Sequence, residues 1–417
     1  MTIRAFEGGA GCGKTYRLIM TLSETLAQRP LLPGQKVLAI TYMHGSRRRL
    51  NNRLRSLGMP YECATLDSVA FRVVARWQAL AAHFGYPVPR ETEYDAVCAV
   101  AATLLEFPEV ANWLAAACPI VLIDEAQDLC ATRLRIVQAL ADRTEILLAA
   151  DEFQCLNQAL RPNPCCSWLG SVTELEILTN PYRTSDQDLL AAAAALRSGG
   201  SPVSARSFQI KDAPREALAG TYLSNQIGWH RRGGTVAILT PTAPGYPMRA
   251  IAWATANRTK RGQGPHRIDL EQGEKEIATD IIGSLSLPDR CGLAEVHDAV
   301  QGIGVSSIAT ALREWLDVQQ RARGRNEIDR TEIEDVIRRA ASLRQRYGTV
   351  PSGKILAMTI HAAKNREFDG VVVLWPYAIG GDAEQKRRLL YNAVTRARRW
   401  CLVLLQGAQL RCQPPFT

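Results

Sequence analysis

The segment GGAGCGKT, from Gly8 to Thr15, is the most informative part of this 417-residue chain. It fits the pattern G-x-x-x-x-G-K-[ST], follows the apolar segment 3–6, and precedes a segment with helical periodicity. A glycine loop between a strand and a helix presents backbone N–H groups to phosphate. We therefore expect Lys14 to reach the β- and γ-phosphates of ATP and Thr15 to bind Mg²⁺. The predicted nucleotide-binding positions here are Gly8, Gly11, Cys12, Gly13, Lys14, Thr15 and Tyr16.

A second segment, PIVLIDEAQD at 119–128, predicts the acidic half of the same site. Its apolar run is typical of a parallel strand buried on both faces, and Asp124 stands at the end of that strand. Beside a phosphate loop, Asp124 would hold Mg²⁺ through water, and Glu125 would polarise the attacking water. The two segments together predict an NTPase that uses ATP and Mg²⁺.

The composition is that of a soluble globular protein with two or three domains. The chain is 47% hydrophobic and 22% charged, and it has no run of about 20 apolar residues. The N-terminus lacks the shape of a secretion signal, so we expect a cytoplasmic protein without membrane contact. The eleven cysteines are scattered without a CxxC pair, which predicts reduced thiols and neither a structural zinc site nor an iron–sulfur cluster.

The positive charge is concentrated near the N-terminus. The chain carries a net charge of +9, and residues 1–60 hold ten basic and two acidic side chains. Within 45–57, Leu50, Leu54 and Leu57 fall on one helical stripe that should face the core. The remaining surface is largely covered by Arg47, Arg48, Arg49, Arg53 and Arg55. Such a helix suits a polyanion such as nucleic acid, and a solvated face is the alternative.

Further segments follow one another in a recognisable order. They are ITYMH at 40–44, TLDSVA at 65–70, IDEAQD at 123–128, LAADEFQ at 148–154, LTNPYRT at 178–184, TIHAAKNREFD at 359–369 and LYNAVTRA at 390–397. In this order they resemble the motifs of the UvrD/Rep/PcrA branch of superfamily 1 DNA helicases. The chain thus resembles a compact member of that family.

The resemblance implies roles for further residues of the ATP site. Gln154 and Arg183 would contact the γ-phosphate. Tyr182 would stack on the adenine and Glu367 would contact the ribose. Arg396 would act as the arginine finger that stabilises the transition state.

The resemblance also implies a path for single-stranded or tailed duplex DNA. Tyr42 would stack on a base, and the arginines that follow would contact phosphates. The expected DNA contacts are Tyr42, His44, Arg48, Arg49, Thr65, Ser68, Thr359 and His361.

Some positions depart from the family pattern. Asp67 stands where histidine is usual, and Asn365 and Arg366 replace Gly-Leu. Asn157 and Ala159 occupy positions where relatives carry aromatic side chains that stack on DNA bases. Because such stacking contributes roughly 1–3 kcal/mol per base, we expect a weaker grip on DNA.

The expected fold is α/β, with two RecA-like lobes built on parallel sheets and small helical insertions in each lobe. Lobe 1A would span 1–180 with an insertion at about 75–117. Lobe 2A would combine 181–245 with 350–417, and a reduced, mainly helical 2B-like insertion would occupy 246–349.

Two functions are compatible with these features. The first is an ATP-dependent single-stranded DNA translocase or helicase, moving 3′ to 5′ as the resemblance implies. The alternative is a DNA-stimulated ATPase subunit or switch that binds DNA and a partner protein, such as a nuclease of a repair or defence complex, and unwinds little alone.

Overall fold

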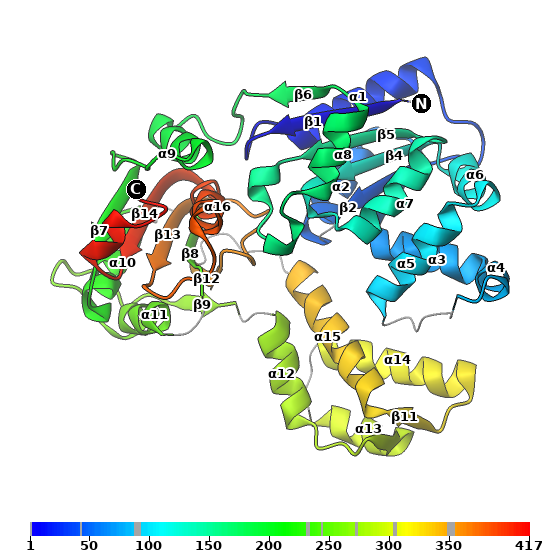
Figure 1. The fold of residues 1–417 in the computed structure, drawn as a ribbon. Coiled ribbons are helices and arrows are strands. Elements are labelled where there is room, and N and C mark those ends of the chain that lie inside the picture. Colours follow the sequence, from blue (N-terminus) through cyan, green and yellow to red (C-terminus); the bar gives the residue numbers. More distant parts are fainter. Residues whose placement is uncertain are drawn as a thin grey trace.

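Two six-stranded parallel sheets form the body of the protein (Figure 1). The computed structural model describes residues 2–41, 44–86, 93–230, 234–242, 245–271, 274–302, 307–347 and 355–417. Within these ranges it describes the side chains at all positions except 44–49, 230, 274–277, 307, 322–323, 339 and 342–347. The expected α/β class with two parallel-sheet lobes is confirmed.

The first sheet has the order β3-β2-β4-β5-β1-β6. Its strands are β1 (Ile3–Gly8), β2 (Val37–Thr41), β3 (Tyr61–Thr65), β4 (Ile120–Asp124), β5 (Glu145–Ala150) and β6 (Leu175–Leu178). All residues of β2 and β4 are buried, as expected for central strands covered on both faces. Since β5 lies between β4 and β1, the carboxyl ends of these three strands meet at one edge.

Helices cover both faces of this sheet. They are α1 (Lys14–Gln28), α2 (His44–Arg55), α3 (Leu66–Arg76), α4 (Gln78–His83), α5 (Tyr94–Leu105), α6 (Pro108–Ala117), α7 (Ala131–Ala141) and α8 (Pro164–Val172). Short 3₁₀ turns are η1 (Ala126–Asp128), η2 (Glu152–Gln154) and η3 (Gln158–Leu160). Two leucines of the predicted stripe, Leu50 and Leu54, are buried with α1 and β2 on one face. The third, Leu57, lies beyond the end of α2 and is partly buried.

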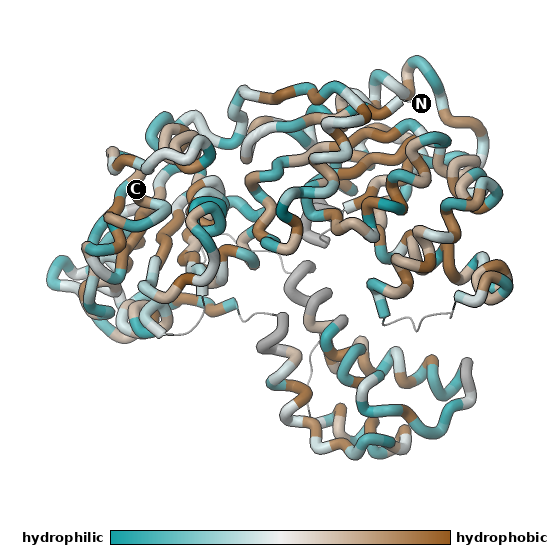
Figure 2. Tube along the Cα trace, viewed as in Figure 1, coloured by the Kyte–Doolittle hydropathy of each residue, from teal (hydrophilic) through white to brown (hydrophobic). Residues whose placement is uncertain are grey.

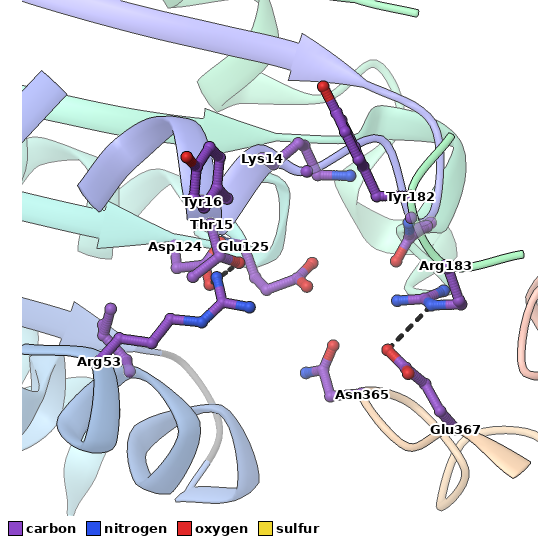
Figure 3. A pocket seen from close by; sticks show the side chains of 14 residues that line it. Lys14, Thr15, Tyr16, Arg53, Asp124, Glu125, Tyr182, Arg183, Asn365 and Glu367 are labelled. Atoms are coloured by element: carbon purple, nitrogen blue, oxygen red, sulfur yellow. Dashed lines mark hydrogen bonds and ion pairs between the residues drawn. The ribbon is translucent and has the colours of Figure 1, made fainter. Parts of the chain in front are cut away.

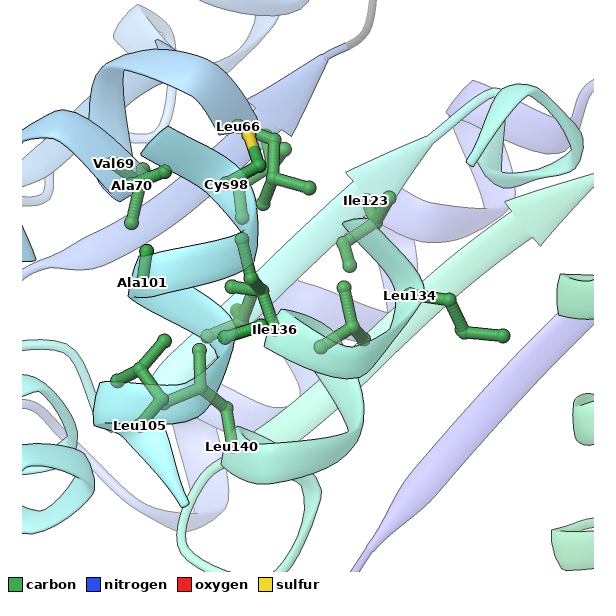
Figure 4. Close-up of a cluster of buried hydrophobic side chains, with 14 of the residues drawn as sticks. Leu66, Val69, Ala70, Cys98, Ala101, Leu105, Ile123, Leu134, Ile136 and Leu140 are labelled. Carbon is green, nitrogen blue, oxygen red and sulfur yellow. The ribbon is translucent and has the colours of Figure 1, made fainter. Parts of the chain in front are cut away.

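The opposite face of the sheet carries a larger core. There α5 packs between α3 and α7, with Val69, Ala101 and Ile136 among the buried side chains (Figure 4). The helices around 75–117 therefore share the core of the first sheet. Within the described residues no single helix is long and apolar enough to cross a membrane; α5 and α6 reach that length only together, and they meet at 99°.

The second sheet has the order β7-β14-β13-β8-β12-β9. Its strands are β7 (Phe208–Asp212), β8 (Val236–Thr240), β9 (Ile268–Leu270), β12 (Ile355–Thr359), β13 (Phe368–Trp375) and β14 (Ala397–Leu405). Its helices are α9 (Gln187–Ser198), α10 (Glu216–His230), α11 (Tyr246–Ala256), α16 (Ala383–Val394) and the 3₁₀ helix η4 (Ala408–Cys412). Apolar segments concentrate on the strands of both sheets (Figure 2).

A helical subdomain with its own core lies between β9 and β12 (Figure 1). It consists of α12 (Glu274–Ser284), β10 (Arg290–Gly292), α13 (Leu293–Gln301), α14 (Ser307–Arg323), β11 (Glu327–Asp329) and α15 (Arg330–Tyr347). The segment 246–271 instead supplies α11 and β9 to the layers of the second sheet. We therefore propose that the insertion spans 274–347, a shorter range than the 246–349 expected from the sequence.

Candidate functional site

The phosphate loop joins β1 to α1 at the carboxyl edge of the first sheet. Gly11 and Gly13 have φ values of 82° and 78°, which glycine adopts without steric cost. Space requires glycine as well. A Cβ on Gly11 would lie 2.6 Å from the Cβ of Arg183, and a Cβ on Gly13 would lie 2.9 Å from the ring of Tyr182. The glycines therefore allow the segment after β6 to approach the loop.

Lys14 begins α1, and its side chain folds back over the loop. Its Nζ donates to the carbonyl oxygens of Gly8 at 2.8 Å and Gly9 at 3.1 Å. It also lies 3.6 Å from Oδ2 of Asp151. Lys14 is buried, so its charge is held inside the loop, where an anion bound by the loop N–H groups would meet it.

Thr15 and Asp124 lie side by side, as the sequence predicted. The Thr15 hydroxyl donates to Oδ2 of Asp124 at 2.9 Å, and the backbone N–H of Glu125 donates to Oδ1 at 3.1 Å. Hydroxyl and carboxylate oxygens are the ligand types that Mg²⁺ prefers. The donor set of Thr15 and Asp124 therefore fits Mg²⁺.

Glu125 follows the strand end in the left-handed region, with φ 60°. Its Oε2 accepts a hydrogen bond of 2.5 Å from Nε2 of Gln127. Burial opposes ionisation, but the positive charges of Lys364 and Lys14 and the bond from Gln127 outweigh it, so the pKa of Glu125 lies below its usual value. Glu125 is therefore ionised at neutral pH, the state that a general base requires.

Gln127 and Asp151 connect the ends of β4 and β5. The Oε1 of Gln127 accepts the backbone N–H of Asp151 at 2.9 Å. The Oδ2 of Asp151 accepts Nε2 of Gln154 at 2.8 Å. Asp151 and Gln154 are both buried. Gln154 thus lies beside the lysine of the phosphate loop, held by the same carboxylate.

Residues from beyond β6 complete the site. The Arg183 guanidinium donates from Nε to Oε1 of Glu367 at 2.9 Å and from Nη1 to the carbonyl of Thr395 at 2.9 Å. Arg398 donates to the other oxygen, Oε2, of Glu367 from Nη2 at 2.6 Å. Glu367 is thus held between two arginines. Arg398 therefore also has a carboxylate partner.

These groups line one cavity of about 550 Å³ between the two sheets (Figure 3). Tyr16 and Tyr182 line it, and the two residues are 59% and 72% exposed, so their rings are accessible for stacking. The lining residues are Gly11, Gly13, Lys14, Thr15, Tyr16, Leu50, Arg53, Asp124, Glu125, Gln154, Tyr182, Arg183, Asn365 and Glu367.

Three lining residues were not predicted for this site from the sequence: Leu50, Arg53 and Asn365. Arg53 of α2 was assigned to a DNA-facing surface, yet its side chain extends along the cavity toward Thr15 and Asp124 (Figure 3). Asn365 has φ 64°. The sequence did contain a hint of this backbone conformation. Asparagine tolerates the left-handed region, and Asn365 stands where the family carries glycine.

Arg396 lies close to the cavity without lining it. It is 1% exposed, and its Nε donates to the carbonyl of Asn392 at 3.0 Å. Its positive charge contributes to the lowered pKa of Glu125. The structure therefore brings Arg396 within electrostatic reach of Glu125, and a contact with phosphate would require a rearrangement.

The predicted DNA-binding residues divide into two groups. Tyr42 lies outside the described residues, as do the side chains of His44, Arg48 and Arg49, whose backbone belongs to α2.

The other group makes local contacts. Thr65 caps α3 by accepting the backbone N–H of Ser68 at 3.2 Å, and the two hydroxyls lie 2.9 Å apart. The Thr359 hydroxyl accepts the N–H of Ala362 at 3.2 Å, while His361 is exposed after β12.

Asp67, the departure from the family histidine, has a structural partner. Its Oδ1 accepts Nε of Arg133 at 2.9 Å and the Sγ–H of Cys98 at 3.2 Å. Arg133 also donates to Asp95 at 2.8 Å. This group joins α3, α5 and α7, so a carboxylate at position 67 supports the packing of the helical insertion.

The segment after Gln154 is packed beneath α16 of the second lobe. The carbonyl of Cys155 accepts Nη1 of Arg388 at 3.3 Å, and that of Leu156 accepts Nε2 of Gln385 at 3.0 Å. Leu156 is buried in the core of the second sheet. The Asn157 side chain bonds to the N–H of Ala159 at 3.1 Å, which orders η3. This segment forms a contact between the lobes.

Comparisons with known proteins give two family matches. Residues 2–159 match the AAA domain family, and residues 354–404 match the UvrD-like helicase C-terminal domain family. Among curated proteins, none matches this chain.

Solved structures resemble the chain only distantly. One is the Arterivirus nonstructural protein 10 helicase, with 11% identity, a TM-score of 0.41, and coverage of 100% of this chain and 62% of that one. Another is the PRRSV helicase, with 13% identity, a TM-score of 0.40, and coverage of 99% and 54%. The chain spans about three fifths of the first of these proteins and about half of the second.

The two family matches agree with the geometry described above. The AAA match contains the phosphate loop together with Asp124 and Glu125, and the C-terminal match contains Glu367 and Arg396. The two matched segments contribute to the first and second parallel sheets respectively. The two family matches together support the resemblance of this chain to the UvrD-like superfamily 1 helicases.

Proposed function

We propose that this chain is an ATP-dependent translocase or helicase that moves 3′ to 5′ along single-stranded DNA in the cytoplasm and hydrolyses ATP between its two lobes. One observation carries the proposal. Lys14, Thr15 and Glu125 of the first lobe and Arg183 and Glu367 of the second line the same cavity. Hydrolysis in such a cavity would depend on the relative position of the lobes, which is how a motor couples chemistry to movement.

The first lobe would bind the triphosphate. Lys14 would leave the carbonyls of the loop for the β- and γ-phosphates, and the N–H groups at the start of α1 would bind phosphate oxygens. Mg²⁺ would be held by Thr15 and by Asp124, and would neutralise charge on the phosphates when bound. Tyr16 and Tyr182 would stack on the adenine, and Glu367 would contact the ribose.

The chemical step would use groups from both lobes. Glu125 is ionised and would polarise the attacking water. Gln154 would report the presence of the γ-phosphate through Asp151, to which it is bonded. Arg183 would exchange Glu367 for the γ-phosphate. Arg396 would stabilise charge in the transition state once the lobes move.

DNA would pass along the surface that α2 and the segment after β12 contribute. Tyr42 and His361 would contact bases, and Arg48 and Arg49 would contact phosphates. Thr65, Ser68 and Thr359 would also contact the DNA, and their hydroxyls already make local hydrogen bonds that order these segments.

The alternative is a DNA-stimulated ATPase subunit or switch that requires a partner protein, such as a nuclease, to unwind. A specific observation favours it. Asn157 and Ala159 stand where the family resemblance places base-stacking aromatics, and their segment is packed against α16. The residues expected for ATP hydrolysis are all present. The segment that would carry the base-stacking aromatics instead forms a contact between the lobes.

One experiment tests both functions. ATP hydrolysis by the purified chain is measured with and without single-stranded DNA, alongside displacement of a strand from a 3′-tailed duplex. We expect DNA to stimulate hydrolysis and displacement of tens of base pairs to be weak without a partner. Hydrolysis that DNA does not affect would refute both functions, and processive displacement by the chain alone would refute the alternative.

A further inference from the structure

Arg197 lies on the far side of the phosphate loop from the nucleotide cavity. It comes from α9, which packs on the second sheet against α16 and β14. Its Nη1 donates to Oδ1 of Asp151 at 2.7 Å. Asp151 is completely buried and belongs to the first lobe. The pair therefore joins an arginine of the second lobe to a carboxylate at the floor of the phosphate loop.

Asp151 has two cations within reach. Arg197 contacts Oδ1, and Lys14 lies 3.6 Å from Oδ2. A buried carboxylate needs a positive partner, because leaving it unpaired in a poorly solvated site is costly. With Arg197 in place, Asp151 keeps its partner when Lys14 moves toward a phosphate. Without Arg197, Lys14 would be the nearest remaining cation, and Asp151 would compete with the nucleotide for it.

A second residue of the same lobe supports the loop directly. The Tyr391 hydroxyl accepts the backbone N–H of Ala10 at 2.8 Å and lies 3.4 Å from Nη1 of Arg197. Between α9 and the loop lies a cavity of about 440 Å³, lined in part by Arg197, Tyr391 and Gly9. The two side chains therefore line the same cavity behind the phosphate loop and connect the second lobe to that loop.

We infer that Arg197 is a positioning residue for nucleotide binding, which neutralises Asp151 so that Lys14 is free to bind phosphate. The inference rests on the proposed ATPase function. Because Arg197 belongs to the second lobe, separation of the lobes would withdraw it from Asp151 and weaken the hold on the nucleotide. The nucleotide affinity would then depend on how the lobes are arranged, because Arg197 acts on Lys14 through Asp151 without touching the nucleotide.

The test compares variants of the full chain by titration with a fluorescent, non-hydrolysable ATP analogue. Arg197→Met should weaken binding by about tenfold or more, and Arg197→Lys should weaken it less because it keeps the charge. Adding Asp151→Asn to Arg197→Met should restore much of the affinity, since the competing carboxylate is gone. A purely structural role predicts no such rescue. Arg161→Met, which removes another arginine between the lobes, should bind like the wild type.

The outcomes separate this inference from the proposed function. Wild-type affinity in Arg197→Met, or loss that Asp151→Asn does not reverse, would overturn the role of Arg197 while leaving the ATPase intact. A wild-type chain that neither binds nor hydrolyses ATP would overturn both. If Arg197→Met does not fold, Arg197→Gln with and without Asp151→Asn applies the same comparison.

Discussion

Lys364 Nζ lies 2.6 Å from each carboxylate oxygen of Asp128. Lys364 follows β12 of the second sheet, and Asp128 ends η1 of the first lobe. Both side chains are nearly buried. Burial alone would lower the pKa of Lys364, but the carboxylates of Asp128 and Glu125 raise it above its usual value. A charged pair therefore crosses between the lobes beside the proposed general base.

Lys364→Met should shift the pH dependence of ATP hydrolysis. In the wild-type chain the pKa of Glu125 lies below its usual value, so Glu125 is protonated only at low pH. The rate of ATP hydrolysis should therefore fall only at low pH. The positive charge of Lys364 is the strongest effect that lowers the pKa of Glu125. Without it, burial should raise that pKa. The acidic limb of kcat against pH should therefore move to higher pH. Lys386→Met on α16 is the matched control, and identical profiles for all three chains would contradict the coupling.

Replacing groups that act on the phosphates should separate binding from catalysis. Lys14→Ala should abolish ATP binding, and Glu125→Gln should keep ATP bound while blocking hydrolysis. Arg396→Ala should lower kcat by roughly 10³–10⁵ with a smaller effect on binding, the range found for arginine fingers. Arg411→Ala, a second-lobe arginine paired with Asp212, serves as control. Wild-type turnover in Arg396→Ala would exclude it as the finger.

The arginines of α2 should fall into two functional groups. Arg53 lines the nucleotide cavity, so Arg53→Ala should raise the KM for ATP with little effect on DNA binding. The pair Arg48→Ala and Arg49→Ala should weaken DNA binding across sequences and lower its salt dependence, because fewer counterions are released. Filter binding at several salt concentrations and steady-state kinetics distinguish the two effects. An unchanged salt slope would make Arg48 and Arg49 a solvated face.

Asn365 should be replaceable by glycine but not by a branched residue. At φ 64°, glycine is unstrained, while valine would be forced into a region that its side chain disfavours. Asn365→Gly should lower the thermal unfolding temperature much less than Asn365→Val, because glycine keeps the backbone unstrained. Asn365→Val should lower stability by roughly 1–3 kcal/mol. Equal melting temperatures for the two variants would show that the backbone here adapts to its side chain.

Local sequence was sufficient to predict much of the nucleotide site. Lys14 and Thr15 belong to a contiguous loop between a strand and a helix, and such a loop has a narrow range of geometries. Asp124 could be placed because the carboxyl ends of parallel strands share an edge. The alternation of apolar strands and helices also indicated two parallel sheets. Thr15 and Asp124 are 109 positions apart, and their contact follows from the shared edge of the parallel sheet.

Tertiary packing decided the contacts between distant segments. The direction of Arg53 depends on how α2 rotates when Leu50 and Leu54 enter the core. The partner of Asp67 is Arg133, which follows it by 66 positions. Asp151 meets Arg197 only because α9 of one lobe approaches a strand end of the other. Short-range geometry and burial specify the phosphate loop, its acidic strand end and the two-sheet fold, so these features could be predicted from the residues alone. The ion pairs between the lobes depend on tertiary structure. Two charged side chains pair when they lie close together in space, and the periodicity of the sequence does not show which distant residues will do so.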